Sequence, residues 1–241
     1  MKKNIVAIIP ARGGSKGIPD KNIVDFCGRP LLSWTTERAL QTKEISSVWV
    51  SSDSSKVLET ANRFGANCIK RPDDISGDKA TSESAWQHAL DMIEKQTGPV
   101  DIVVAMQVTS PLRGKNDLSK GISDFIKNRY DSLFSASKID DMFLWEKNNK
   151  GELESINYDH KNRKRRQDFS PQFVENGSFY IFKPSILRTL NNRLGGRIGM
   201  TLMDFWQMFE IDNLDDLRFC EVLMEKYILK KEGSPQELPS F

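Results

Sequence analysis

Short apolar runs rich in β-branched residues alternate along the chain with segments whose apolar residues recur at helical spacing. The chain opens with such a run at residues 4–9, which predicts a buried parallel strand. Further strands are expected at residues 47–53, 67–72, 101–107, 132–137, 177–182 and 206–212. Helices are expected at residues 31–42, 55–65, 82–95 and 214–230. This alternation predicts an α/β fold with a mostly parallel sheet flanked by helices.

One stretch departs from the alternation. From about residue 139 to residue 174 the sequence is polar, dotted with aromatic residues and without helix caps. We interpret it as a small excursion from the main sheet. A chain of 241 residues has room for one sizeable α/β domain. We place this domain at residues 1–232 and expect a loose tail with Pro and Ser at residues 233–241.

The first strand runs into a loop that combines glycines with cations. It reads Ala11-Arg12-Gly13-Gly14-Ser15-Lys16-Gly17 and is followed by Lys21-Asn22. Glycines let the backbone turn N–H groups toward an anion, and Arg12, Lys16 and Lys21 add full positive charges. The glycine spacing excludes a Walker A loop and the dinucleotide fingerprint. A surface turn with solvated cations is the alternative, but open α/β sheets bind ligands at this position, which favours a polyphosphate.

Composition narrows the class of protein further. The 35 Lys and Arg residues nearly balance the 33 Asp and Glu residues, which argues against a general binder of nucleic acid or membrane surfaces. Cys27, Cys68 and Cys220 are scattered and form no C-x-x-C pair, as expected for reduced thiols. The apolar run before Arg12 is too short for a signal peptide or a membrane span. We therefore expect a cytoplasmic enzyme.

The loop and the Lys21-Asn22 pair resemble the signature of the cytidylyltransferases that activate sialic acids and related nonulosonic acids. The resemblance extends along most of the chain and implies a three-layer, Rossmann-like nucleotidyltransferase fold. It implies transfer of CMP from CTP to the anomeric hydroxyl of a nine-carbon keto-sugar acid, with release of pyrophosphate. It also implies Mg²⁺ as cofactor and a homodimer formed through the excursion. The related family that acts on the eight-carbon acid Kdo has a loop more like S-x-R-x-P-x-K-P, and Lys16 and Asn22 fit the sialate pattern better.

The resemblance also implies which residues bind the nucleotide. These residues are Arg12, Gly13, Gly14, Ser15, Lys21, Asn22, Arg71 and Ser82. Arg12, Lys16 and Lys21 would act in catalysis, because fixed cations stabilise the charge that develops on the departing pyrophosphate. Two positions have alternatives: Arg71 can be an exposed cation at a strand end, and Thr81 or Ser82 can simply cap the helix that follows.

The segment Glu210-Ile211-Asp212 carries the expected metal ligands. Residues i and i+2 of a strand point to the same face, so the carboxylates of Glu210 and Asp212 would converge. Oxygen ligands beside a triphosphate suit Mg²⁺. The family pattern is more often Asp-x-Asp, from which Glu210 departs, and Asp212 is therefore the stronger candidate for a catalytic role. The alternative is a solvated acidic turn before a helix, with Asp215 and Asp216 favouring the helix N-terminus.

The acceptor is expected to contact two separate segments. The run Q-V-T-S-P-L-R at residues 107–113 resembles the family segment beside the sugar acid, where Gln107 would contact the acceptor and Arg113 would brace the loop. The cation run at residues 161–166 resembles the part of the family excursion that reaches the neighbouring subunit. Arg166, or Arg165 if the register differs by one, would bind the acceptor carboxylate there.

Two rival functions are left open by these patterns. One is a cytidylyltransferase that acts on Kdo instead of a nine-carbon acid. The other is a non-catalytic protein that binds nucleotide or nucleic acid through the cation run, because such runs occur in nucleic-acid patches. Pyrophosphate release with acceptors of different lengths would separate the three functions.

Overall fold

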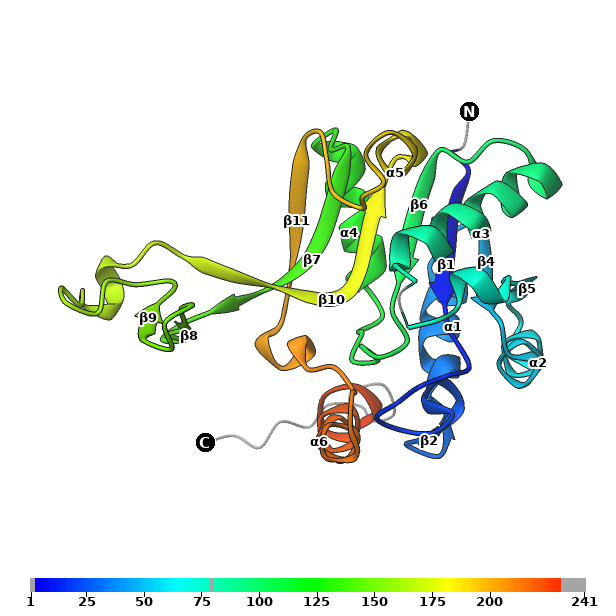
Figure 1. Ribbon diagram of the computed structural model, residues 1–241. Helices are drawn as coiled ribbons and strands as arrows, with labels where there is room; N and C mark the ends of the chain where they lie inside the picture. The colour runs from blue at the N-terminus through cyan, green and yellow to red at the C-terminus, as the bar shows by residue number, and fades with distance from the viewer. Residues whose placement is uncertain (1–2, 79, 231–241) are drawn as a thin grey trace, which may run out of the picture.

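The computed structural model describes residues 3–78 and 80–230, and this part contains a seven-stranded sheet in the order β11-β7-β10-β6-β1-β4-β5 (Figure 1). The strands are β1 (Ile5–Pro10), β4 (Ser47–Ser52), β5 (Asn67–Lys70), β6 (Ile102–Met106), β7 (Ser132–Ile139), β10 (Gln172–Phe182) and β11 (Ile198–Met203). β10 is antiparallel to its neighbours β6 and β7, and the other pairings are parallel. The prediction of a mostly parallel α/β sheet is confirmed.

Helices cover both faces of the sheet, which gives three layers (Figure 1). One face carries α1 (Leu31–Gln41), α2 (Ser55–Arg63) and α4 (Asp117–Lys127), and the other carries α3 (Ser82–Thr97) and α5 (Pro184–Leu190). Val6 and Ile8 of β1 pack in the core with α3, whereas Ile5, Ala7 and Ile9 pack in the core with α1, α2 and α4. A strand buried on both faces is apolar throughout, which explains why this run is uninterrupted.

Shorter elements complete the body of the protein. The loop after β1 contains a 3-10 helix, η1 (Lys21–Ile23), and a small hairpin of β2 (Asp25–Phe26) and β3 (Arg29–Pro30). A second 3-10 helix, η2 (Asp73–Ile75), follows β5. The last helix, α6 (Leu214–Met224), continues into a π-helical turn (Glu225–Leu229), so the helix expected at residues 214–230 is confirmed. No helix in the described ranges is long and apolar enough to cross a membrane.

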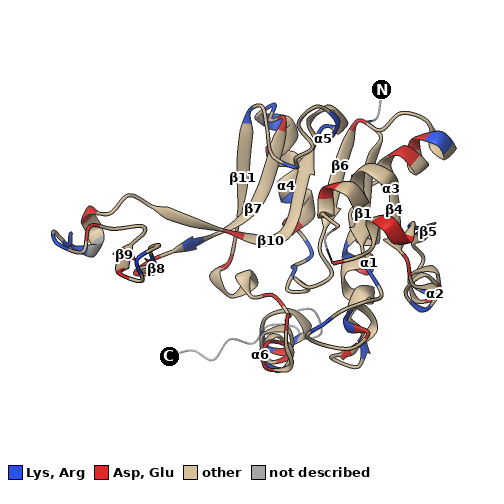
Figure 2. Cartoon of the chain, viewed as in Figure 1, with Lys and Arg blue, Asp and Glu red and all other residues tan. Residues whose placement is uncertain are grey.

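The stretch between β7 and β10 leaves the body as a narrow arm (Figure 1). The paired strands β7 and β10 form its root, and it carries a hairpin of β8 (Trp145–Lys147) and β9 (Leu153–Ser155). A 3-10 helix, η3 (Arg166–Asp168), precedes the return strand. Lys and Arg residues gather at its far end (Figure 2). The excursion expected at residues 139–174 thus corresponds to this arm, whereas the tail expected at residues 233–241 lies outside the described residues.

The prediction of a strand at residues 206–212 is wrong. The segment begins with a 3-10 helix, η4 (Phe205–Met208), and residues 209–213 form neither helix nor strand. The backbone N–H of Asp204 donates to Oε1 of Gln207 at 2.8 Å, and Nε2 of Gln207 donates to the carbonyl oxygen of Leu112 at 2.9 Å. The first bond closes the turn, the second anchors Gln207 to the distant residue Leu112, and β11 already occupies the sheet position beside β7.

Candidate active site

A cavity of about 300 Å³ opens at the carboxyl ends of β1 and β6, beside the first turn of α3. Most of the residues expected to bind nucleotide or acceptor line it: Arg12, Ser15, Lys16, Lys21, Asn22, Arg71, Ser82 and Gln107. They come from the loop after β1, the end of β5, the start of α3 and the end of β6. The sheet brings them together because parallel neighbouring strands end at one edge.

Two hydrogen bonds hold the loop after β1 in position. The side-chain amide of the buried Asn22 donates to the carbonyl oxygen of Arg12 at 2.8 Å. The backbone N–H of Gly13 donates to Oδ1 of Asp53 at 2.9 Å. This N–H is therefore already used within the protein, and Gly13 and Gly14 do not line the cavity. The loop offers the cavity side-chain cations and the side chain of Ser15.

Asp53 belongs to this site although the sequence patterns did not identify it. It lies directly after β4, and its Oδ1 atom is 3.8 Å from the NH2 atom of Arg71. One carboxylate thus contacts both the glycine loop and a cation of the cavity wall. The sequence signal was only an acidic residue at the end of a buried strand. Its partners are distant along the chain, so the fold had to bring them together.

Arg71 is buried, with 5% of its surface exposed, so the alternative of an exposed cation is wrong. Its Nε atom donates to the hydroxyl of Ser76 at 3.1 Å, and its NH2 atom has no hydrogen-bond partner within the described ranges. Burial lowers the pKa of the Arg71 guanidinium, and the nearby charge of Asp53 opposes this shift. A buried donor without a partner at a cavity wall is suited to bind an oxygen of a ligand.

The hydroxyl groups of Thr81 and Ser82, at the start of α3, lie in different surroundings. Thr81 is the N-cap residue, and its hydroxyl accepts the backbone N–H of Ser84 at 3.1 Å. Ser82 is the first helical residue and lines the cavity. Capping is therefore the role of Thr81, which leaves the Ser82 side chain for a ligand.

Lys21 joins the loop after β1 to the segment before α6. Its Nζ atom donates to Oδ1 of Asp212 at 2.8 Å and to the carbonyl oxygen of Ile211 at 3.0 Å. The Lys21 side chain is 14% exposed, whereas that of Asp212 is 73% exposed. A Cβ atom at Gly17 would overlap the carbonyl oxygen of Asp212, so only glycine permits this close approach.

Glu210 lies next to this contact, half-buried against the backbone of Gly177. Gly177 has a φ of 64°, and a Cβ atom there would overlap the Glu210 carboxylate. Burial raises the pKa of Glu210, and the negative charge of Asp212 raises it further. The two carboxylates are thus electrostatic neighbours, although they do not lie on the strand that the sequence pattern predicted.

Arg113 is fully buried beside the carboxyl end of β6. Its NH1 atom donates to the hydroxyl of Thr35 at 2.9 Å, and its NH2 atom donates to the carbonyl oxygens of Gln107 and Ser178. Burial lowers the pKa of Arg113 to about 9. These bonds tie the end of β6 to β10, so the expected bracing role is confirmed and the backbone of Gln107 is fixed.

The arm holds the arginines expected at the acceptor carboxylate. Arg165 forms an ion pair with Asp168, at 2.8 Å between Nε and Oδ2. Arg166 begins η3, and its side chain lies outside the part of the protein that the structure describes. The arm extends away from the body, so these positions lie apart from the cavity of the same chain (Figure 1).

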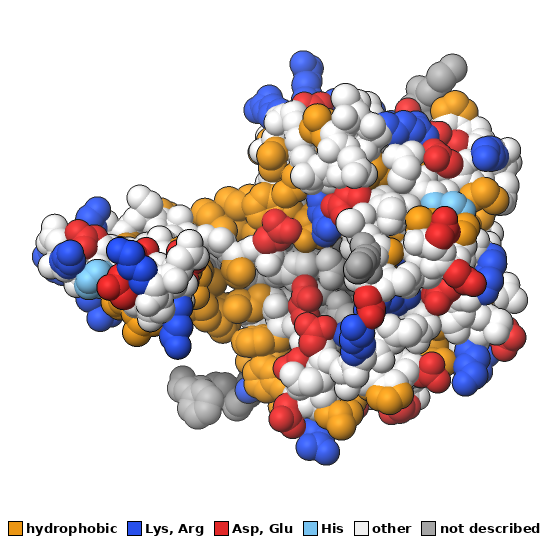
Figure 3. Space-filling view, viewed as in Figure 1, with side chains coloured by type: hydrophobic (Ala, Val, Ile, Leu, Met, Phe, Trp, Pro, Cys, Tyr) orange, Lys and Arg blue, Asp and Glu red, His pale blue; other side chains and the backbone are white. Residues whose placement is uncertain are grey.

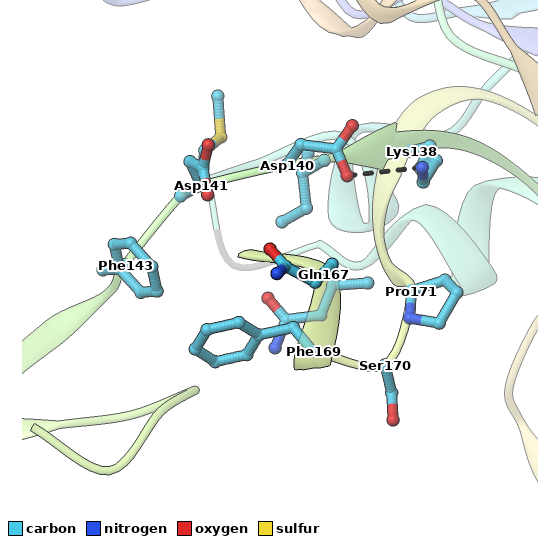
Figure 4. A pocket seen from close by; sticks show the side chains of 11 residues that line it. Lys138, Asp140, Asp141, Phe143, Gln167, Phe169, Ser170 and Pro171 are labelled. Carbon is cyan, nitrogen blue, oxygen red and sulfur yellow. Dashed lines mark ion pairs between the residues drawn. The ribbon is translucent and has the colours of Figure 1, made fainter. Parts of the chain in front are cut away.

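A second cavity, of about 390 Å³, lies at the root of the arm between the end of β7 and residues 167–172 (Figure 4). Phe143, Phe169 and Pro171 contribute to its lining. Its lining cation, Lys138, is paired with Asp140 at 3.3 Å. Among the described residues, this cavity therefore has a single lining cation, whereas the cavity beside β1 is lined by Arg12, Lys16, Lys21 and Arg71.

Comparison with known proteins identifies the family. Residues 6–232 match the family described as Cytidylyltransferase. The chain belongs to the cytidylyltransferase family. It is 33% identical over 240 residues to the pseudaminic acid cytidylyltransferase of Campylobacter jejuni subsp. jejuni serotype O:23/36 (strain 81-176), covering 92% of this chain and 96% of that protein.

Two further similarities concern a longer protein and a solved structure. The chain is 37% identical over 191 residues to N-acylneuraminate cytidylyltransferase A of Danio rerio, covering 77% of this chain but only 43% of that protein. A structure of CMP:2-keto-3-deoxy-manno-octonic acid synthetase complexed with CTP has a TM-score of 0.72 at 17% identity, covering 94% of this chain and 100% of that one. This likeness confirms the expected three-layer nucleotidyltransferase fold.

The carboxylates of this cytidylyltransferase fit a hard divalent cation. Mg²⁺ is commonly bound by one or two carboxylates together with phosphate oxygens and water. Glu210 and Asp212 offer such a pair beside the cations of the cavity. The described ranges contain no group of three or more His, Cys, Asp or Glu side chains that could hold a metal ion. Two carboxylates fit Mg²⁺ where phosphate and water oxygens complete its coordination.

Proposed function

We propose that this protein transfers CMP from CTP to the anomeric hydroxyl of a nonulosonic acid and releases pyrophosphate. The observation that carries the proposal is the convergence of Arg12, Lys16, Lys21 and the buried Arg71 on one cavity at the edge of the sheet. Fixed cations in this arrangement suit a polyphosphate. The acceptor class is supported by the names of the relatives, a pseudaminic acid and an N-acylneuraminate cytidylyltransferase.

The cavity residues would act through position and charge. The oxygen of the anomeric hydroxyl bonds to the α-phosphorus and its proton passes to water, while the bond from that phosphorus to the pyrophosphate oxygen breaks. Arg12, Lys16 and Lys21 stabilise the charge that develops on the pyrophosphate, and losing one such contact costs about 3 kcal/mol of transition-state stabilisation. The nucleotide contacts of the cavity are Ser15, Asn22, Arg71 and Ser82, and Gln107 contacts the acceptor.

Mg²⁺ is the cofactor that we propose for this site. Asp212 and Glu210 would hold it, and when bound it supplies positive charge to the phosphate oxygens. Lys21 keeps Asp212 close to the loop after β1 through the bond to Oδ1. The half-buried Glu210 has a longer side chain than the Asp found more often at this position in the family. We therefore propose Asp212 as the principal ligand.

The arm supports a homodimer as part of the proposal. Its large apolar side chains are 38–62% exposed: Leu144, Trp145, Leu153, Ile156 and Phe173. Hydrophobic side chains are visible along the arm between its far end and the body (Figure 3). A contiguous apolar surface of this kind marks an interaction site. We propose that a second copy covers it, so that Arg166 binds the acceptor carboxylate in the cavity of the partner subunit.

Pyrophosphate release tests the proposal directly. The protein is incubated with CTP, Mg²⁺ and, in separate reactions, nine-carbon keto-sugar acids including N-acetylneuraminate and pseudaminate, with Kdo as the control. We expect release with a nine-carbon acid and loss of release in Lys21→Ala. Release with Kdo alone would favour the alternative acceptor, and salt-dependent binding of nucleic acid without any release would favour the non-catalytic rival. Sedimentation would test the homodimer, and the cytoplasmic location stays a prediction.

A further inference from the structure

A single carboxylate neutralises two of the cations assigned to the triphosphate. Oδ1 of Asp78 lies 2.9 Å from NH1 of Arg12, and its Oδ2 lies 2.7 Å from Nζ of Lys16. Asp78 lines the cavity together with both cations. These contacts hold the pKa of Asp78 below its ordinary value, with Lys16 making the largest contribution. Asp78 is therefore anionic at neutral pH and bridges the two ends of the loop.

The bridging geometry is the one that a phosphate group would adopt with the same two cations. Each carboxylate oxygen accepts from a different donor, as two oxygens of a polyphosphate would. Asp78 and the triphosphate therefore compete for the same N–H groups. Asp78 belongs to the segment after η2, which is distant in sequence from the loop. Its side chain is 52% exposed, so it can turn into water when an anion replaces it.

We propose that Asp78 is an active-site residue that yields Arg12 and Lys16 to the triphosphate of CTP and pairs with them again when pyrophosphate leaves. This inference rests on the proposed function for the identity of the ligand. A site whose cations are already neutralised binds the nucleotide less tightly, because displacing the carboxylate lowers the net gain. By the same competition, the Asp78 carboxylate lowers the affinity of Arg12 and Lys16 for the product pyrophosphate. Asp78 thus sets both nucleotide affinity and pyrophosphate release.

The expected effect is moderate because exposed ion pairs are weak. Each such pair contributes little in water, and two of them together correspond to a change in affinity between about twofold and about tenfold. The effect should shrink at high salt, because exposed charges are screened.

The test compares Asp78→Asn with Asp74→Asn. Asp74 is an exposed carboxylate of η2 that does not line the cavity, so its removal changes the net charge equally without freeing either cation. Titration calorimetry measures the Kd for CTP and for inorganic pyrophosphate, and a thermal melt checks folding. We expect Asp78→Asn to bind both anions about twofold to tenfold more tightly, Asp74→Asn to match the parent protein, and Asp78→Glu to restore weaker binding.

Two results of the titration would overturn the inference. An unchanged Kd in Asp78→Asn would show that the carboxylate does not compete with phosphate. Weaker binding would show that it helps to hold the nucleotide, for example through a metal ion. The titration needs no acceptor, so its result is separate from the proposed reaction. If no acid supports pyrophosphate release while the ranking of CTP affinities holds, the proposed function fails and the role of Asp78 stands.

Discussion

Replacing Gly17 with Ala tests how the loop after β1 is fitted to the segment that carries Asp212. A Cβ atom at this position would overlap the carbonyl oxygen of Asp212 and lie 3.3 Å from its carbonyl carbon. Gly17 does not have a positive φ, so the cost of the substitution is steric and not conformational. Relief requires the two backbones to move apart by about 1 Å, and a displacement of that size in a catalytic site reduces the rate by about 10²-fold.

Stability should change together with activity. Forcing an extra methyl group into a tight contact costs about 1–3 kcal/mol. The matched variant is Gly14→Ala, because a Cβ atom there meets nothing within 4 Å. This variant should gain about 0.4–1 kcal/mol, since alanine restricts the unfolded chain. Urea denaturation of both variants measures the free energy of unfolding, and steady-state kinetics gives kcat/KM for CTP in Gly17→Ala.

The reasoning would be refuted if Gly17→Ala were as stable as Gly14→Ala. Such a result would mean that the loop yields without cost and that the approach of Gly17 to Asp212 does not hold the site together. Loss of activity without loss of stability would instead indicate a direct clash with the nucleotide. A crystal structure of Gly17→Ala would then reveal whether Nζ of Lys21 still reaches Asp212.

Three further predictions follow from contacts around the site and the fold. Asp53→Ala should raise KM for CTP about tenfold, because it leaves the Gly13 N–H without its acceptor and removes the carboxylate that lies 3.8 Å from the Arg71 guanidinium; an unchanged KM in steady-state assays would contradict this role. The Arg197 backbone N–H and the Lys183 ammonium hold the pKa of Asp131 below its ordinary value. The Asp131 carboxylate therefore stabilises the fold at pH values above its pKa in the unfolded chain, and this stabilisation is lost as the pH falls through its pKa in the folded protein. Asp131→Asn should therefore unfold more easily than the parent protein at about pH 7 but not at about pH 2, and a difference independent of pH in urea denaturation would count against this ion pair. Burial raises the pKa of Cys27 to about 12, so iodoacetamide at about pH 8 should alkylate the exposed Cys68 before Cys27, as peptide mass spectrometry can check.

Local sequence patterns were sufficient to predict most strands of the sheet. The strands at residues 5–10 and 102–106 are apolar runs, because both of their faces are covered by helices. The loop after β1 was recognisable from its glycines and cations alone. The helix α4 was also encoded locally, since Leu118, Ile122 and Phe125 recur at helical spacing and are buried, but this signal was not recognised. β11 gives a weaker signal, because Gly199 interrupts its apolar residues.

The site required contacts that no local pattern specifies. Glu210 and Asp212 were expected on a strand because their spacing fits one, but the bonds of Gln207 to Leu112 and Asp204 produce a 3-10 helix instead. The roles of Asp53 and Asp78 could not be predicted for the same reason, since each contacts residues that are far away in sequence.

Periodicity along the chain determined which residues are buried in strands and helices, and the composition of one loop determined which cations line the cavity. Only the tertiary structure decided which carboxylate lies against which cation. Burial is a property of a residue and its near neighbours, and it leaves a repeating trace in the sequence. An ion pair between distant segments depends on the relative placement of whole elements, so it leaves no such trace.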